Sequence, residues 1–361
     1  MFSLRAALRR TENAAPEFSN FFSFPDGYLT MASSFLMDLD PEAPRCIVTI
    51  GEIVVEIMAE TQGIGFLEPM ALKGPYPSGA PAIFIDQAAK LGVDCGVISA
   101  VGHDDFGTLN VERLKHDGVD ISAILRADSY ATGSAFVRYR PDGSRDFVYN
   151  IRQSACSQIG LHEAARALLK RATHFHVMGS SLFSFPIIDA VTTAVHQVKA
   201  QGGTISFDPN IRKEMLDIPD MKAALELMLQ ECDIFLPSGP ELLLFCNGTT
   251  QEEAIREILD MGVSEIVLKQ GNEGATCFCA DKTVHNVAFT AQEIDPTGAG
   301  DCFGATYVTC RLSGKTREDS LRYACASGAR AVSVFGPMEG TSSFAELDQL
   351  IAAQKVNGAA S

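Results

Sequence analysis

The sequence has 361 residues, of which 46% are hydrophobic and 20% are charged, and its formal net charge is −16. This composition is typical of a globular protein with an ample core, and the acidic balance argues against a nucleic-acid partner, whose phosphates require basic patches. No apolar run reaches the roughly 18 residues that span a bilayer, so we expect no membrane partner.

The ten cysteines form no Cys-x-x-Cys pair, and most lie singly in apolar stretches. Cys277 and Cys279 are two residues apart on a strand-like segment. Buried free thiols in a reducing compartment explain this pattern better than disulfides or a zinc site do. We therefore expect a cytoplasmic protein.

Residues 1–42 differ from the rest of the chain. They contain early arginines but no apolar region followed by a cleavage site, and the acidic Glu12, Glu17 and Asp26 argue against a mitochondrial presequence. We expect a disordered N-terminal extension here and a single folded domain over residues 43–355.

Strand-like and helix-like patterns alternate along that domain. The strand-like segments are 46–59, 95–102, 173–179, 204–208, 232–237 and 264–271. The helix-like segments are 80–92, 106–118, 187–203 and 253–262. Such alternation predicts an α/β fold, with a doubly wound, mostly parallel sheet and helices on both faces.

Residues 131–150 interrupt this alternation of strands and helices. They form two strand-like segments, each with alternating polar and apolar residues, around a turn at 141–144. A hairpin does not join a parallel sheet easily, so we interpret segments 53–78 and 130–152 as a small β lid over the ligand-binding edge. An ordinary surface hairpin is the alternative. The arginines of the segment favour a lid, because guanidinium groups suit oxygen-rich ligands; they are Arg138, Arg140, Arg145 and Arg152.

The small residues Gly298, Ala299 and Gly300 stand directly before Asp301 and a helix-like segment. Free amides at a helix start form an anion site. Asp301 could accept a hydroxyl proton while those amides stabilise a transferring phosphoryl group, or it could merely cap the helix. The run is not a dinucleotide fingerprint, because Phe303 stands where that motif has its third glycine.

Five blocks in order resemble the ribokinase (PfkB) carbohydrate kinase family, and the resemblance runs from about Cys46 to Leu350. The blocks are SGAPAIFIDQAAKLG (78–92), VGHDDFGTLNVERLKHDGVDIS (101–122), FDPNIR (207–212), VLKQGNEGA (267–275) and DPTGAGDCFGA (295–305). The resemblance implies a ribokinase-like fold in which Asp301 is the catalytic base. It also implies that Gly298, Ala299 and Gly300 form the anion hole.

The resemblance extends to ligand-binding residues. It implies substrate contacts by Glu56 at the end of the first strand, Gly79, Ala80, Asp208 and Arg212. We add Arg138 and Arg152 from the lid, because guanidinium groups suit oxygen-rich ligands. It implies ATP contacts by Asn210, Ser238, Glu241, Lys269, Gly271, Gly274 and Gly336. Glu241 would also organise Mg²⁺ through water, and Asp295 and Thr297 would hold a monovalent cation such as K⁺. Three positions depart from the family pattern, where asparagine is usual: Ile83, Ser238 and Cys325.

We therefore expect an ATP-dependent sugar kinase that phosphorylates a primary hydroxyl of a ketohexose, with tagatose favoured over fructose. A 2-keto-3-deoxygluconate kinase is the alternative, because Arg152 could pair with a sugar acid. A nucleoside kinase, a dehydrogenase and a non-catalytic sugar-binding regulator are further readings. Lids of relatives pair between subunits, so the resemblance also implies a homodimer through the lid.

Overall fold

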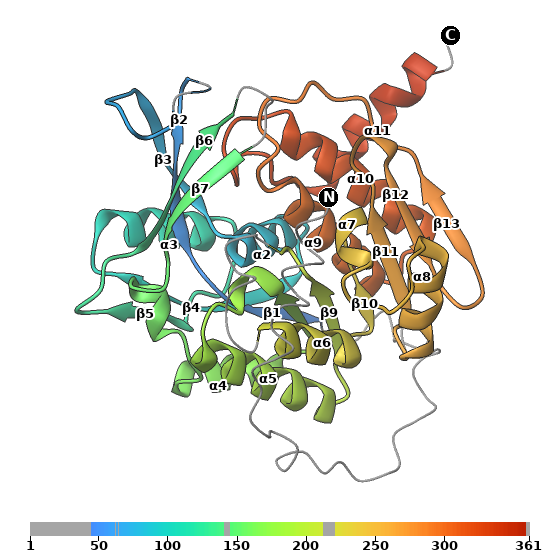
Figure 1. Ribbon diagram of the computed structural model, residues 1–361, viewed down its shortest axis with the longest axis horizontal. Coiled ribbons are helices and arrows are strands. Elements are labelled where there is room, and N and C mark those ends of the chain that lie inside the picture. Colours follow the sequence, from blue (N-terminus) through green and yellow to red (C-terminus); the bar gives the residue numbers. More distant parts are fainter. Residues whose placement is uncertain (1–44, 62, 64, 141–144, 212–220, 359–361) are drawn as a thin grey trace.

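The computed structural model describes residues 45–61, 63, 65–140, 145–211 and 221–358, which form two β-sheets and the surrounding helices (Figure 1). The larger sheet has nine strands, in the spatial order β13 (Thr283–Asn286), β12 (Ala275–Phe278), β11 (Glu265–Lys269), β10 (Ile234–Phe235), β9 (Thr204–Asp208), β8 (His174–Met178), β1 (Cys46–Ile50), β4 (Asp94–Gly102) and β5 (Ile124–Ala127). All neighbours pair in parallel except β11–β12 and β12–β13. The predicted doubly wound, mostly parallel fold is confirmed.

Helices cover both faces of this sheet. They are α2 (Ala80–Lys90), α3 (Asp105–His116), α4 (Glu163–Arg171), α5 (Phe185–Ala200), α6 (Met221–Glu231), α7 (Gly239–Leu242), α8 (Gln251–Asp260), α9 (Ala299–Leu312), α10 (Arg317–Val332) and α11 (Phe344–Gly358). Within the described residues, none of them combines the length and the apolar composition needed to span a bilayer.

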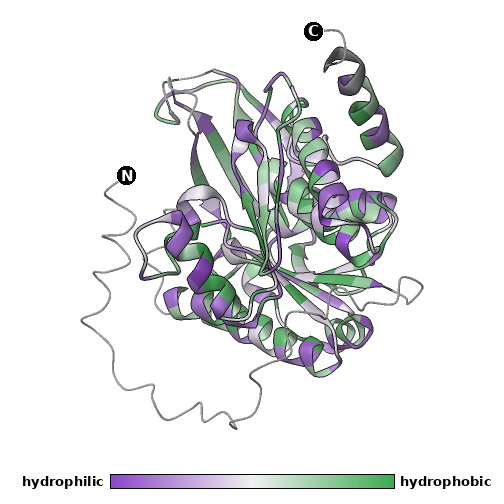
Figure 2. Cartoon of the chain, turned by 90° about the vertical axis from the view of Figure 1, so that its right-hand side faces the viewer, coloured by the Kyte–Doolittle hydropathy of each residue, from purple (hydrophilic) through white to green (hydrophobic). Residues whose placement is uncertain are grey.

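The alternation of side chains along the strands divides the core into two apolar clusters. Val48 and Ile50 of β1 belong to the cluster that includes buried residues of α4, α5, α6 and α8. Ile47 belongs to the other cluster, with residues of α2, α3, α9 and α10. Figure 2 shows the hydrophobic residues of the strands inside the molecule and helices that alternate between hydrophilic and hydrophobic along their length. Helices such as α4 and α8 therefore bury one face, whereas α9 is buried along its length between the sheet and its neighbouring helices.

The second sheet has four strands in the order β3 (Leu72–Ser78), β2 (Val54–Ala59), β6 (Gly133–Tyr139) and β7 (Arg145–Asn150). The segment 46–59, which reads as one strand-like run, is therefore two strands in two different sheets. β1 ends at Ile50, and the chain leaves the large sheet before β2 begins. The turn predicted at 141–144 and the extension 1–42 lie outside the described residues.

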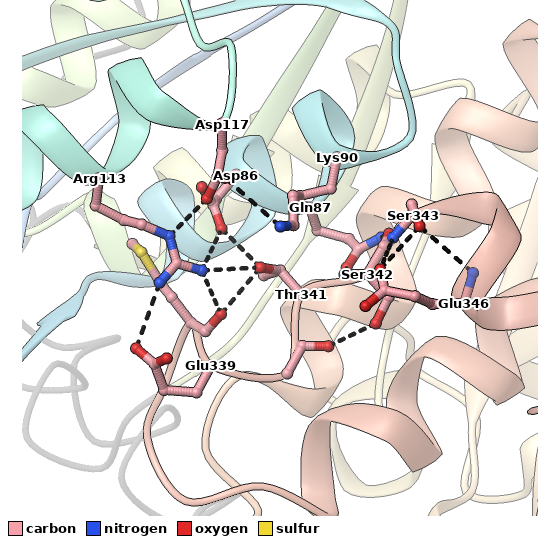
Figure 3. Close-up of polar contacts among 12 residues, drawn as sticks. Asp86, Gln87, Lys90, Arg113, Asp117, Glu339, Thr341, Ser342, Ser343 and Glu346 are labelled. Carbon is pink, nitrogen blue, oxygen red and sulfur yellow. Dashed lines mark hydrogen bonds and ion pairs between the residues drawn. The ribbon is translucent and has the colours of Figure 1, made fainter.

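A polar cluster around Arg113 connects α2 and α3 to the loop after α10 (Figure 3). The Arg113 guanidinium contacts the carboxylates of Asp117 at 2.6 Å and Asp86 at 3.3 Å, and it donates to the Met338 carbonyl at 2.8 Å. Burial raises the pKa of the Asp86 carboxyl to about 7, although Arg113 opposes the shift. Thr341 donates to the same carboxyl at 2.8 Å.

A second pair of hydrogen bonds fixes the same loop. Gln87 of α2 donates to the Ser342 carbonyl and accepts from the Ser342 amide, both at 2.8 Å. The loop therefore has a fixed position beside α2 and carries Pro337 to the start of α9. There the carbonyl oxygen of Pro337 lies directly against Gly298.

Candidate active site

A cavity of about 710 Å³ lies between the large sheet and the inner face of the second sheet. Residues that follow the carboxyl ends of β1, β8, β9 and β11 line it, as is usual for ligand sites in open α/β sheets. The predicted site residues that line the cavity are Glu56, Gly79, Ala80, Arg152, Asp208, Asn210, Ser238, Glu241, Lys269, Gly271, Thr297, Gly298, Gly300 and Asp301. The chain fold thus collects residues from four of the five sequence blocks, and from segments between them, at one place.

The start of α9 forms the predicted anion site. Gly298 is the N-cap of the helix and has a φ of 79°, in the left-handed region that favours glycine. A Cβ atom at this position would lie 2.4 Å from the Pro337 carbonyl oxygen. The amides of Ala299, Gly300 and Asp301 follow, and amides in a first helical turn have no partner within the helix. This turn can therefore hold an anion.

The two glycines of this turn should respond differently to alanine. We expect Gly298→Ala to lower the free energy of unfolding by about 1–3 kcal/mol, because of the positive φ and the approach to Pro337. Gly300 has only Lys269 Nζ near the place of a Cβ atom, at 3.8 Å, so Gly300→Ala should leave stability unchanged or raise it by up to about 1 kcal/mol. Urea unfolding of both variants checks this, and equal losses would contradict it.

Asp301 is buried in the first turn of α9, with an exposed fraction of 7%. The N-cap of the helix is Gly298, so Asp301 is not the capping residue itself. Asn210, which also lines the cavity and has a positive φ of 38°, donates from Nδ2 to Asp301 Oδ1 at 3.4 Å. A carboxylate at the mouth of an anion site is placed to accept a proton from a substrate hydroxyl.

Lys269 provides a largely buried positive charge next to this carboxylate, with a side chain that is 16% exposed. Its ammonium group lies 2.5 Å from Asp208 Oδ2. Burial alone would lower the pKa of Lys269, but the carboxylates of Asp208, Glu241 and Asp301 outweigh that effect and raise it. The lysine therefore remains charged, and it lies 3.8 Å from where a Cβ atom of Gly300 would be.

Glu241 uses both carboxylate oxygens for the local structure. One accepts from the Ser238 amide at 2.8 Å and from its hydroxyl at 2.5 Å, which forms a capping box at the start of α7. The other accepts from the Ile211 amide at 2.8 Å. Among the described residues, no cluster of three or more His, Cys, Asp or Glu side chains could hold a metal ion alone.

Asp295 is fully buried behind the anion site and does not line the cavity. Its carboxylate accepts from the amides of Thr297 at 3.0 Å and Gly336 at 3.1 Å. Gly336 thus contacts Asp295 and is not among the residues that line the cavity. Gly274 is also absent from the lining: a Cβ atom there would lie 2.0 Å from the carbonyl oxygen of Asn286, so this glycine serves the packing of β12 against β13.

Two buried glutamates, Glu52 and Glu56, also line the cavity. Glu56 lies on β2 of the second sheet, not at the end of the first strand as the sequence suggested, and accepts from Ser78 Oγ at 2.7 Å. Glu52 is the acid that follows β1, and it accepts from Ser181 Oγ at 2.6 Å and Ser180 Oγ at 3.4 Å. Sequence reasoning missed Glu52 as a site residue, although its place directly after a strand was a signal.

The arginines in the second sheet and directly after it differ in whether they line the cavity. Arg152 and Arg145 line the cavity, together with Phe147. Arg138 does not line it: its guanidinium contacts Asp146 at 2.7 Å. Side chains alternate along a strand, and Arg138 has the opposite parity to Ala135, which does line the cavity, so it points to the other face.

Three further residues singled out in the sequence have different positions in the structure. Ile83 lines the cavity, where its apolar side chain replaces an asparagine of the family pattern. Cys325 is buried in α10 and does not line it. Arg212 lies outside the described residues.

A carboxylate that faces a helix start able to hold phosphate is an arrangement suited to phosphoryl transfer, and the polar cavity beside it suits a small hydroxylated acceptor. Fold and site together define the class of an α/β phosphotransferase. Residues 45–343 match the profile of the pfkB family carbohydrate kinase. The chain belongs to this family and is a carbohydrate kinase, as the sequence motifs implied.

Several known proteins are similar to this chain. The 2-dehydro-3-deoxygluconokinase of Thermoproteus tenax is 31% identical over 318 residues, which cover 86% of this chain and 96% of that protein. Probable fructokinase-5 of Arabidopsis thaliana is 29% identical over 295 residues, covering 78% of this chain and 90% of that protein. An E. coli protein provisionally called Ribokinase II, solved with ATP and Mg²⁺, has a TM-score of 0.82 and 52% identity, and covers 86% of this chain and 99% of that one.

Proposed function

We propose that this carbohydrate kinase transfers the γ-phosphate of ATP to a primary hydroxyl of a neutral ketohexose, tagatose ahead of fructose. The observation that carries the proposal is that Asp301 lines one cavity together with Gly298 and Gly300 at the start of α9 and with the buried Glu52 and Glu56. We assign the end of the cavity at the two glutamates to the sugar. A sugar bound at that end can direct a terminal hydroxyl to Asp301.

The residues of the site have separate roles in this reaction. Asp301 accepts the proton of the sugar hydroxyl, and Asn210 orients its carboxylate. The amides of Gly300 and its neighbours, with the charge of Lys269, stabilise the phosphoryl group while it moves. The second sheet covers the cavity as a lid and keeps water from competing with the sugar.

ATP is proposed to bind on the side of Ser238, Lys269 and Gly271, all of which line the cavity. Mg²⁺ would accompany ATP and neutralise the charge of its phosphates. Glu241, which lines the same cavity, would hold the ion through water. The E. coli relative, 52% identical and solved with ATP and Mg²⁺, supports this assignment. Asp295 and Thr297 would hold a monovalent cation such as K⁺, and replacing K⁺ by a larger organic cation in the assay tests that role.

The charge of the cavity favours a neutral sugar. Glu52 and Glu56 are 5% and 3% exposed, so the sugar end carries two buried carboxyl groups. A substrate carboxylate at 4 Å from one ionised glutamate would cost about 4 kcal/mol at an effective dielectric of 20. Hydroxyl groups, in contrast, donate hydrogen bonds to such acceptors.

A sugar acid, 2-keto-3-deoxygluconate, is the second candidate, because Arg152 also lines the cavity and could pair with a carboxylate. The similarity to the Thermoproteus tenax 2-dehydro-3-deoxygluconokinase, which is named for the same compound, supports this candidate.

A coupled assay of ADP release tests the proposal. Tagatose, fructose, 2-keto-3-deoxygluconate and a nucleoside are compared by kcat/KM at saturating ATP and Mg²⁺. We expect a ketohexose to lead. A tenfold advantage for the acid would favour the second candidate, and absence of turnover with every sugar would favour a non-catalytic sugar-binding regulator.

We also propose that the protein is a homodimer through the second sheet. Val148 of β7 is 57% exposed and has the opposite parity to the cavity-lining Phe147 and Tyr149, so it lies on the outer face. The exposed Val148 on the outer face and the edges of β3 and β7, which have no further strand partner among the described residues, are features that association would cover. Light scattering at micromolar concentration should give twice the monomer mass, and a monomer mass would contradict the proposal.

A further inference from the structure

Arg145 lies at the start of β7, where the hairpin of β6 and β7 reaches over the cavity. It pairs with Tyr139 at the end of β6, and its side chain extends across to the opposite wall. Nη1 donates to the hydroxyl of Thr297 at 2.5 Å. Thr297 directly precedes Gly298, the N-cap of α9. This guanidinium contact thus joins the second sheet to the segment that begins the anion site.

Arg145 forms no ion pair with a carboxylate among the described residues, whereas its neighbours Arg138 and Arg140 do. Arg138 and Arg140 both contact Asp146, at 2.7 and 2.8 Å. Lys269, the cation on the other side of the site, is held by Asp208 at 2.5 Å. Arg145 instead packs over the ring of Phe147, 5.7 Å from its centroid.

Arg152, the other arginine that lines the cavity, is separated from Arg145 by the length of β7. That strand spans roughly 17 Å at 3.3 Å per residue. Arg152 is therefore placed for the sugar end, whereas Arg145 is placed for the anion site.

The charged residues that line the cavity indicate what Arg145 can do at the anion site. The cavity is lined by five acids, Glu52, Glu56, Asp208, Glu241 and Asp301, and by three cations, Arg145, Arg152 and Lys269. A phosphoryl group in transfer adds negative charge next to Asp301. Amide dipoles at the start of α9 face it from one side only, so a cation on the other side would stabilise it.

We propose that Arg145 is a further catalytic residue of the kinase, which contacts the oxygens of the transferring phosphoryl group from the side of the second sheet. A guanidinium has five N–H donors, of which one is used by Thr297, and two parallel donors match two phosphoryl oxygens. The inference rests on the proposed sugar kinase activity.

The step balances without any other reactant. The sugar hydroxyl oxygen forms the new bond to the γ-phosphorus, and the bond from that phosphorus to the bridging oxygen of ADP breaks. The electron pair of the broken bond remains on ADP, and the hydroxyl proton passes to Asp301. Arg145 changes no bond and stabilises charge on the phosphoryl oxygens while they move.

The kinetic test compares Arg145→Gln with the matched control Arg140→Gln. Arg140 is in the same hairpin, is 54% exposed and contacts Asp146, so the control removes an equal charge outside the cavity. We expect Arg145→Gln to lower kcat by about 10³-fold, as arginines at a transferring phosphoryl group do, and to change KM for the sugar less than threefold. Arg145→Lys should recover part of kcat, and Arg140→Gln should match the wild type.

A binding measurement separates catalysis from structure. ADP with aluminium fluoride and the sugar mimics the phosphoryl group in transfer, and Arg145→Gln should lose affinity for this complex while its affinity for ADP alone is unchanged. A kcat within threefold of the wild type, a change in sugar KM alone, or unchanged binding of the aluminium fluoride complex would overturn the inference. Absence of sugar turnover by the wild-type protein would instead refute the proposed function.

Discussion

Asp301→Asn is expected to lower kcat by about 10²–10⁴-fold, the range for loss of a general base, while the dissociation constants of ATP and sugar remain near their wild-type values. The asparagine has nearly the same shape as the carboxylate and can keep the contact with Asn210, which joins Asp301 Oδ1 at 3.4 Å. It cannot accept the hydroxyl proton. The chemical step is therefore lost and the binding surface is not.

Single-turnover kinetics and calorimetric titration of both ligands measure the two effects separately. Asp260→Asn is a matched control, because it makes the same change at an exposed position at the end of α8. A mutant that retains a third of wild-type turnover would remove Asp301 from the mechanism. A large loss of ATP affinity would instead assign it to nucleotide binding.

The large sheet could be predicted because its signals are local. Apolar runs such as 204–208 are too short for helices and are separated by helical patterns, which leaves few topologies other than a doubly wound sheet. The position of Asp301 was also a local signal, since glycines before a carboxylate and a helix are unusual for packing alone. The motif then led to the family to which the chain belongs.

Other features depend on which segments meet in space. The run 46–59 has no turn signal strong enough to separate β1 from β2, so Glu56 was assigned to the wrong strand end and Glu52 was overlooked. Four arginines near the hairpin looked equivalent, yet the parity of the strand directs Arg138 away from the cavity and Arg145 into it. Parity can be read from sequence only after the inner face of the strand is known.

A buried ionic cluster at the other end of α9 is a further feature without a local signal. Glu265, the first residue of β11, is fully buried. It contacts Arg311 of α9 and Arg317 of α10, each at 2.9 Å, and it accepts from Tyr307 Oη at 2.8 Å. In sequence the glutamate reads as the polar start of a strand. In the fold it fixes the helix whose first turn carries Asp301 to the sheet.

We expect Glu265→Gln to lower the free energy of unfolding by about 3–5 kcal/mol, because it removes the negative charge that two largely buried guanidinium groups share. Arg311 and Arg317 have side-chain exposures of only 8% and 13%, so water replaces the lost partner poorly, although Arg317 also contacts the exposed Asp281 at 3.2 Å. Glu318→Gln is the matched control, because it breaks the ion pair between Glu318 and Lys282. These two side chains are 50% and 52% exposed, and exposed pairs contribute at most about 1 kcal/mol.

Urea unfolding of both variants measures the difference in the free energy of unfolding. A loss below 1 kcal/mol for Glu265→Gln would show that the cluster does not hold α9 in place. Below the unfolding transition, the folded variant should keep its kcat, because the cluster acts on the stability of α9 and none of its residues lines the cavity.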